Sequence, residues 1–516
     1  MGVRGLTPFL QKNCPDVLKK LPSRLQSLRG KKIVLDGTLI TQRFHFMRRD
    51  HPYRHILGWY RLAQELNENG VSAICVFDGK ERQVAKAKEV ERRQAVRQLA
   101  QSRGGIERER FQRLRQLKEG IEIFQNVSFA DKQQVFMALS DLPNVEYCTS
   151  TLLQQGPPNE PKDEIPSLTE ESPPDSHLQE MPHIGHTALP ITPDQLPNHF
   201  RSLNIGYKAA IAKLFSASID STGIPIQPAV SAGGQQASQT VTKKQFNLTI
   251  QEGELWNALT QSSEYPTADL ASAMGEKINS LVEESYMLSM SFDRRSNRPT
   301  QTIYNQSKDV LRAMGIPCID ATGAVEAEAL ASAIVLNGHA DFVASEDTDV
   351  LVYEAPLMKN ITSYSEPIVL VSGSDIRNAL GLSREAYVDL AVLMGTDFSD
   401  RIKNIGPVHA YQYIKEYGTI ERIIEFVRSD TKFITNLSWE TYLARVNIAR
   451  LVFNTLPAIP PLQSLQAIEK DDQEVTKILG SYGLGFTQMA GDTWDYEAVY
   501  QLTLGGNYFS DAPAVS

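Results

Sequence analysis

Two short apolar runs, each ending in an aspartate followed by glycine, constrain the fold of this chain most strongly. The run 31–35 ends at Asp36, and the run 73–77 ends at Asp78. A helical pattern across residues 55–69 lies between them. Strands separated by helices are typical of a parallel sheet, whose ligand site lies at the carboxyl ends of the strands. The sequence therefore predicts an α/β fold with both aspartates at the functional edge of the sheet.

Five more carboxylates stand in comparable positions later in the chain. Glu326 and Glu328 open an Ala-rich helical pattern, whereas Asp347, Asp349 and Asp397 follow apolar runs. Any one such acid is more often a cap than a ligand. Several acids at one sheet edge would repel each other unless something neutralises them. Bound divalent metal is the simplest explanation, and carboxylate oxygens suit Mg²⁺ or Mn²⁺, so we predict a metal-dependent enzyme that acts on phosphates.

The composition fits two to three domains with a sizeable core, since the chain has 516 residues and is 41% apolar. The four cysteines are scattered, without a spacing that predicts zinc, and fit a reducing compartment. The first residues lack the long apolar stretch of a signal peptide or a membrane span. We therefore expect an intracellular protein without membrane contact.

Charge is distributed unevenly along the chain. The net charge of -9 argues against a nucleic-acid-binding protein if the chain is taken as a whole. Between Lys80 and Lys118, however, thirteen Lys and Arg residues stand against five acidic residues. This segment is polar and strongly helix-forming. It predicts either a basic surface for an anion or a solvated helix with ion pairs between successive turns.

The middle of the chain changes in composition. Residues 150–245 are rich in Pro, Ser, Gln, Thr and Gly, which predicts a disordered insertion interrupted by short helices, for instance around Tyr207–Phe215. The α/β pattern then resumes, with helices expected over 301–314 and 324–337 and strands over 316–320, 342–345 and 367–371. From Arg384 onward the pattern is mostly helical.

Several segments, in order along the chain, resemble those of the XPG/flap endonuclease family of structure-specific nucleases. The resemblance covers roughly residues 1–120 and 300–455. Each motif alone is weakly specific, whereas their shared order together with all seven acids is much more specific. The similar segments are 1–8, 34–37, 76–80, 312–317, 326–329, 344–349, 394–398 and 402–407.

The resemblance implies a PIN-like (5′-3′ exonuclease-like) α/β domain with a mostly parallel sheet, a helical arch and a C-terminal helix-two-turn-helix. The implied domain order is an N-terminal region with the basic arch (1–120), a helical extension (121–149), the disordered insertion (150–245), a helical lead-in (246–300), the internal region (301–383), a helical C-terminal domain (384–506) and a tail (507–516).

The implied activity is hydrolysis of DNA phosphodiester bonds at flaps, bubbles or junctions, with 5′ exonuclease activity, in repair or replication. Two Mg²⁺ ions, which Mn²⁺ can replace, would act on the attacking and leaving oxygens. RNA stays open as a substrate because phosphate contacts do not report the sugar. The implied metal ligands, direct or through water, are Asp36, Asp78, Glu326, Glu328, Asp347, Asp349 and Asp397.

In this family a Lys and an Arg of the arch reach toward the scissile phosphate, where their charge is needed. Arg92 has the expected spacing, but Lys86 lies one residue beyond the expected position, and a one-residue gap would pair Lys86 with Arg93. All three are therefore candidate catalytic residues. Further nucleic-acid contacts are expected at Gly2, Arg49, Lys80, Arg401, Lys403 and Gly406.

The hairpin near Ile405 resembles one that grips a duplex strand through its backbone, often with bound K⁺. Asn404 stands where the family commonly has Gly, and Val408 and His409 stand where it often has basic residues. No clamp-binding motif is found near the end of the sequence. With the resemblance, a monomeric protein in the nucleus is expected, and the mitochondrion is left open. The rival hypothesis is a catalytically silent relative that binds RNA or protein in post-transcriptional regulation; its expected mark, the loss of several acids, is absent.

Overall fold

The computed structural model consists of two compact units. Unit 1 comprises Met1–Arg92, Ser167–His177 and Pro299–Ser516, and unit 2 comprises Arg93–Pro166 and Leu178–Arg298. Among the residues that the structure describes, no helix is long and apolar enough to cross a membrane. The described residues are 2–47, 51–79, 81, 86–140, 192–214, 242–261, 268–430, 432, 433, 435 and 437–485.

Unit 1 is built on a seven-stranded sheet with the order β1-β7-β6-β5-β2-β3-β4. The strands from β6 to β4 pair in parallel, whereas β7 pairs antiparallel with both β6 and β1. The predicted α/β class with a mostly parallel sheet is confirmed. The strands are β1 (Lys19–Lys20), β2 (Lys32–Asp36), β3 (Ser72–Phe77), β4 (Cys318–Asp320), β5 (Phe342–Ala344), β6 (Pro356–Lys359) and β7 (Val369–Ser372).

The side chains of β2 alternate between two apolar cores. Ile33 and Leu35 pack in one core with Trp59, whereas Val34 packs in the other with Leu330. Successive side chains of a strand point to opposite faces, and a parallel sheet is covered on both faces, so an uninterrupted apolar run is required here. The sheet is therefore a central layer between two layers of helices.

The first helical layer contains α2 (Gly37–Phe46), α3 (Arg54–Glu68), α10 (Gln301–Ala313) and α18 (Asp472–Ser481). The second layer begins with α1 (Leu6–Asn13), α11 (Ala327–Leu336), α12 (Asp349–Val352), α13 (Gly373–Leu380) and α14 (Arg384–Met394). It continues with α15 (Pro407–Tyr417), α16 (Ile420–Val427) and α17 (Trp439–Asn454), in agreement with the helical pattern expected after Arg384. Short 3₁₀ helices lie at Pro15–Val17, Leu25–Leu28, Pro193–Gln195 and Leu462–Leu465.

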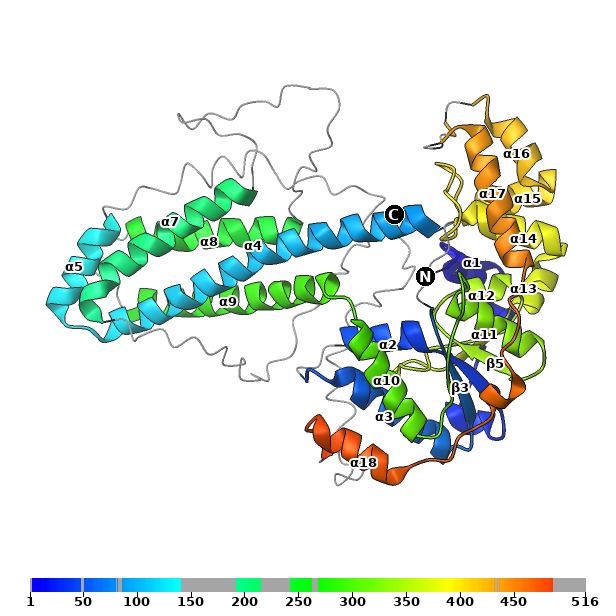
Figure 1. Ribbon diagram of the computed structural model, residues 1–516. Helices are drawn as coiled ribbons and strands as arrows, with labels where there is room; N and C mark the ends of the chain where they lie inside the picture. The colour runs from blue at the N-terminus through cyan, green and yellow to red at the C-terminus, as the bar shows by residue number, and fades with distance from the viewer. Residues whose placement is uncertain are drawn as a thin grey trace. The chain divides into compact units, whose positions relative to one another are not determined.

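Unit 2 is helical and has its own core (Figure 1). Leu196, Phe200, Leu203 and Tyr207 are buried in that core at the spacing of one helix face. The predicted disorder of 150–245 is therefore wrong for most of the helix Leu196–Leu214, of which the sequence predicts only the part from Tyr207 onward, because four well-spaced apolar residues suffice to dock a helix that flanking Pro- and Gly-rich sequence obscures. Residues 150–191 and 215–241 lie outside the described residues. The helices of this part of the chain are α4 (Ala87–Asn126, which starts in unit 1), α5 (Phe129–Ser140), α7 (Leu196–Leu214), α8 (Lys243–Gln261) and α9 (Ala268–Ser296).

Much of the positive charge of α4 is used inside unit 2. Arg113 binds Glu252 through two bonds, Nε to Oε1 at 2.6 Å and Nη2 to Oε2 at 2.9 Å. Arg110 donates from Nη1 to both oxygens of Glu107 at 3.1 and 3.2 Å, and Ser285 donates its hydroxyl to Glu107 at 2.8 Å. We call Glu107, Arg110, Arg113 and Glu252 the four-charge cluster. Its members are buried, so the hypothesis of a solvated basic helix is wrong for this part of α4.

Candidate metal centre

The carboxyl ends of three neighbouring strands bring the first acids together. Asp36 ends β2, Asp78 follows β3, and Asp347 lies just beyond β5. Because β5, β2 and β3 are adjacent and parallel, their carboxyl ends lie at one edge of the sheet. The sequence spacing of these three acids thus becomes a single site in space.

Asp36 and Asp78 also hold neighbouring helices in position. Asp36 caps α2, since its Oδ1 accepts from the Leu39 amide at 3.0 Å, and its Oδ2 accepts from the Ser345 hydroxyl at 2.8 Å. Asp78 Oδ1 accepts from the Ala327 amide at 2.9 Å, at the start of α11. This bond brings the first turn of α11, which carries Glu328, to the same edge of the sheet.

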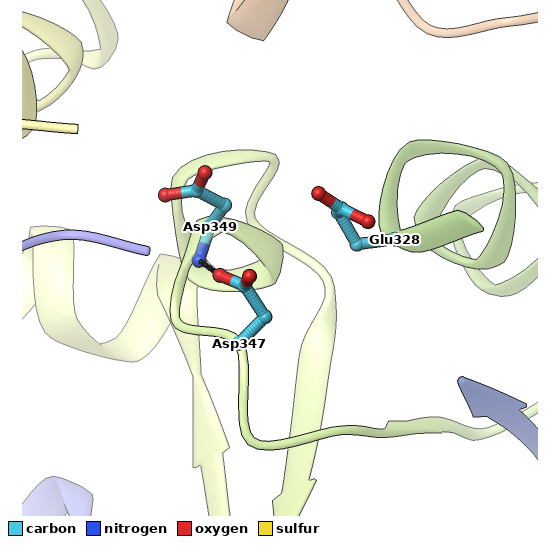
Figure 2. A group of neighbouring side chains, drawn as sticks. All are labelled: Glu328, Asp347 and Asp349. Atoms are coloured by element: carbon cyan, nitrogen blue, oxygen red, sulfur yellow. Dashed lines mark hydrogen bonds between the residues drawn. The ribbon is translucent and has the colours of Figure 1, made fainter. Parts of the chain in front are cut away.

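Glu328, Asp347 and Asp349 form the densest group of carboxylates. One carboxylate oxygen of each lies within 4.8 Å of the others, and all three residues are buried. Figure 2 shows Glu328 reaching from α11 toward Asp347, which lies between β5 and α12, and Asp349, the first residue of α12. The Asp349 amide donates to Asp347 Oδ1 at 2.9 Å, which fixes the turn between them.

The carboxylate of Asp349 is the acid of this group that most clearly suits a cation. The residue is 1% exposed, and neither of its oxygens has a hydrogen-bond partner among the described residues. Burial raises the pKa of Asp349, and the charge of Asp347 raises it further. Burial likewise raises the pKa of Glu328, with Glu326 adding to the effect. An unpaired buried acid among like charges is unfavourable, and an all-oxygen donor set fits Mg²⁺ or Mn²⁺.

Lys86 joins the remaining acids to this group. Its Nζ lies 2.7 Å from Glu326 Oε1, 3.4 Å from Asp397 Oδ2 and 3.5 Å from Glu328 Oε1. Burial alone would lower the pKa of Lys86, but Glu328, Glu326 and Asp397 raise it well above its usual range. The structure thus gathers all seven predicted acids, which we call the acid centre; their role as metal ligands stays a prediction.

Gly2 packs directly against the acid centre. It has a φ of +87°, and a Cβ at this position would lie 2.3 Å from Asp347 Oδ1 and 2.6 Å from the Asp349 nitrogen. The residues after Gly2 are also bonded to a segment that leads to the acid centre, since the Arg4 amide donates to the Gly395 carbonyl, two residues before Asp397, at 2.9 Å. The predicted nucleic-acid contact of Gly2 stays a prediction, and the geometry adds a positioning role that only glycine can fill.

Two hydroxyl residues that the sequence analysis missed help to orient the acids. Ser345 accepts from the Asp347 amide at 3.0 Å while it donates to Asp36. Thr38 Oγ1 accepts from the Asp78 amide at 2.8 Å. Their positions in the sequence could have identified these two residues. Ser345 stands two residues before Asp347, and Thr38 stands two residues after Asp36.

The other predicted residues are less directly placed. Arg92 is exposed and Arg93 half-buried on α4, six and seven residues after Lys86, and their phosphate contacts stay predictions. Arg401 and Lys403 are exposed, and Gly406 caps the start of α15. Arg49 and Lys80 lie outside the described residues.

The hairpin before α15 accommodates its unusual asparagine. Asn404 has a φ of +68°, a conformation that Asn adopts more readily than most residues other than glycine. Its side chain donates to the Lys432 carbonyl at 2.7 Å, and the Ile405 amide donates to the Ile402 carbonyl at 3.1 Å. The tight turn is therefore kept without the glycine that is common in the family, and K⁺ binding near Ile405 stays a prediction.

Comparison with known proteins agrees with this geometry. Residues 1–100 match the XPG N-terminal domain, and residues 315–397 match the XPG I-region. All seven acids lie within these two segments, and the resemblance predicted from the motifs is confirmed. Flap endonuclease 1 of Candida albicans (strain WO-1) is 34% identical over 155 residues, which are 29% of this chain and 41% of that protein.

Flap endonuclease 1 of Eremothecium gossypii is 37% identical over 158 residues, covering 30% of this chain and 41% of that protein. The chain spans about two fifths of the length of these curated relatives. Among solved structures, the catalytic core of Rad2 in complex with DNA substrate (complex IV) is 12% identical, with a TM-score of 0.44 and coverage of 97% of this chain and 99% of that one. Flap endonuclease-1 from Methanococcus jannaschii is 16% identical, with a TM-score of 0.40 and coverage of 95% and 96%.

Proposed function

We propose that this chain, a member of the XPG/flap endonuclease family, is a metal-dependent, structure-specific nuclease that hydrolyses DNA at flaps, bubbles or junctions. The observation that carries the proposal is the acid centre, in which buried carboxylates outnumber the positive charge that contacts them. Asp349, with no partner for either oxygen among the described residues, supports metal binding most directly. A 5′ exonuclease activity and a role in repair or replication belong to the same proposal.

Glu328, Asp347 and Asp349 would hold divalent metal directly, and the remaining acids would do so directly or through water. Two Mg²⁺ ions, when bound, supply a nucleophilic hydroxide and stabilise the leaving oxygen. Asp36 and Asp78 keep the strand ends and the start of α11 in register with these ligands. Lys86, Arg92 and Arg93 would bind the scissile phosphate and offset its charge.

The start of α15 would bind the phosphates of one duplex strand. Gly406 and Pro407 begin this helix, whose first amides point outward as anion donors. The exposed side chains of Arg401 and Lys403 would add positive charge close to this turn. K⁺ at the hairpin near Ile405, and contacts from Gly2, Arg49 and Lys80, complete the proposed nucleic-acid interface.

The direct test is cleavage of labelled 5′-flap DNA, bubble DNA, a four-way junction and matched RNA by the full chain in Mg²⁺. Asp349→Asn should abolish cleavage while sparing binding of the substrate. Asp341→Asn is the matched control. Asp341 directly precedes β5, eight residues before Asp349, but it forms a surface ion pair with Lys31. Binding of every substrate without metal-dependent cleavage would favour the scaffold hypothesis instead.

The scaffold hypothesis is disfavoured by the acid centre itself. A silent relative has no use for seven gathered carboxylates that destabilise the metal-free protein, and all seven are present. RNA remains a second substrate class within the same experiment. We also propose a nuclear location, to be distinguished from a mitochondrial one by imaging of the tagged full chain.

A further inference from the structure

Lys86 contacts the acid centre as a metal ion would. Its ammonium nitrogen touches carboxylate oxygens of Glu326, Glu328 and Asp397, and its side chain is only 12% exposed. The nitrogen also lies 4.7 Å from the centroid of the Phe398 ring, a cation–π contact that supports this position. The Lys86 ammonium is thus held in a defined, largely buried site, unlike the ammonium of an exposed surface ion pair.

The acids that hold Lys86 include one of the proposed metal ligands. Glu328 contacts Lys86 and is also one of the three acids whose oxygens lie within 4.8 Å of one another. A carboxylate can neutralise either an ammonium or a divalent cation. When it binds the divalent cation, its negative charge is neutralised and it attracts the ammonium less strongly. Lys86 and the metal therefore compete for the same negative charge.

While its ammonium contacts these carboxylates, Lys86 cannot also contact a substrate phosphate. Lys86 directly precedes α4, so its release alters the first turn of that helix. We propose that Lys86 is the internal counter-cation of the metal-free acid centre, and that divalent metal releases it from Glu326, Glu328 and Asp397 for use at the phosphate. This inference rests on the proposed function and deepens it, because metal binding becomes the step that frees Lys86 to contact the phosphate.

The coupling works in both directions. If metal binding expels Lys86, then Lys86 opposes metal binding to the same extent, as linkage requires. Removal of the ammonium should therefore tighten metal binding and also leave Glu326, Glu328 and Asp397, which are largely buried, without this cation when metal is absent. These two effects have opposite signs on stability, since Lys86→Met should be less stable without metal and should gain more stability when metal binds.

The test uses the full chain without nucleic acid, so its outcome does not depend on whether the protein cleaves DNA. Lys86→Met is compared with Lys31→Met, which breaks a 2.8 Å ion pair that is about half exposed. We expect Lys86→Met to bind Mn²⁺ about tenfold more tightly in a titration followed by electron paramagnetic resonance, and to melt at a lower temperature in EDTA. Lys31→Met should match the wild type in both measurements.

Hydrogen exchange separates displacement from a simple field effect of the removed charge. In the wild type, Mn²⁺ should speed amide exchange in the first turn of α4, whereas in Lys86→Met it should not. Unchanged or weaker Mn²⁺ affinity in Lys86→Met, or exchange in the wild type that ignores Mn²⁺, would overturn the proposal. Should Lys86→Met fail to fold in EDTA, Lys86→Gln in the same exchange experiment decides the question. A protein that passes these tests yet cuts no substrate would instead refute the nuclease function.

Discussion

The two units bury charge in opposite ways. The four-charge cluster of unit 2 sets two arginines against two glutamates, and Glu252 is matched by a bidentate bond from Arg113. The acid centre of unit 1 gathers seven acids, three of which share the ammonium of Lys86, while both oxygens of Asp349 lack a partner among the described residues. Both clusters are buried, but only one is balanced.

This difference separates structure from function. A balanced cluster offsets its own charges, so it fixes the register of α4 against α8 and needs no added cation. An unbalanced cluster costs stability unless a cation completes it, and a fold that keeps such a cluster does so for binding or catalysis. The contrast predicts that the same chemical change, carboxylate to amide, will have opposite consequences in the two units.

The largest expected effect is on cleavage, through Asp349→Asn. Loss of one ligand charge should lower the cleavage rate by at least roughly 10³-fold. In EDTA the same variant should melt no lower than the wild type, because it removes an unpaired buried charge. Cleavage assays and thermal melts of one preparation check both statements. A clear loss of stability in EDTA would mean that Asp349 is satisfied in the metal-free protein and that the contrast is mistaken.

The next largest effect is on stability, through Glu252→Gln in unit 2. This change leaves Arg113 buried beside a neutral amide, which should cost about 3–5 kcal/mol of the free energy of unfolding of that unit. Glu254→Gln on the same helix is the control, because Glu254 pairs with Lys277 at the surface and should cost less than about 1 kcal/mol. Denaturant unfolding measures both. Equal losses in the two variants would argue that the four-charge cluster is open to water.

A smaller effect is expected from Gly2→Ala. The added methyl group clashes with Asp347 and the Asp349 backbone, so the acids shift and the cleavage rate should fall roughly 10- to 100-fold. Gly338→Ala is the matched control, since Gly338 has a φ of +79° but nothing within 4 Å of the added Cβ. The two variants share the cost of the backbone conformation and differ in contact with the acids. If both lose the same activity, Gly2 has no positioning role.

The smallest expected effect is from the double substitution Glu252→Leu with Arg113→Met. Replacing both partners by apolar side chains of similar size should bring stability back to within about 1 kcal/mol of the wild type, because no lone charge stays buried. Arg110 keeps Glu107 as its partner in this variant. The same denaturant experiment reports the result. A double variant as unstable as Glu252→Gln would show that the pair contributes specific packing that apolar groups cannot replace.

Much of this molecule follows from local sequence. The apolar runs before Asp36 and Asp78 are continuous because each strand is covered on both faces, so their strand character and the acids at their ends could be read directly. The helices after Arg384 follow from apolar residues at helical spacing. β6 was missed, because Pro356–Lys359 is short and does not alternate, and it is identified only by pairing with β5 and β7.

The sequence by itself predicted the seven acids that the fold gathers, since acids at the ends of buried strands and at helix starts stand in a recognisable order; their chemistry stays a prediction. Only the tertiary structure decided how those charges are shared. Arg110 and Arg113 look like phosphate-binding residues in the basic stretch of the sequence, yet Glu252 of a helix about 140 residues later takes their charge into a buried cluster. Lys86 of the same stretch instead reaches the acid centre. Charge partnership depends on distance in space, and the one-dimensional pattern of charges does not contain that distance.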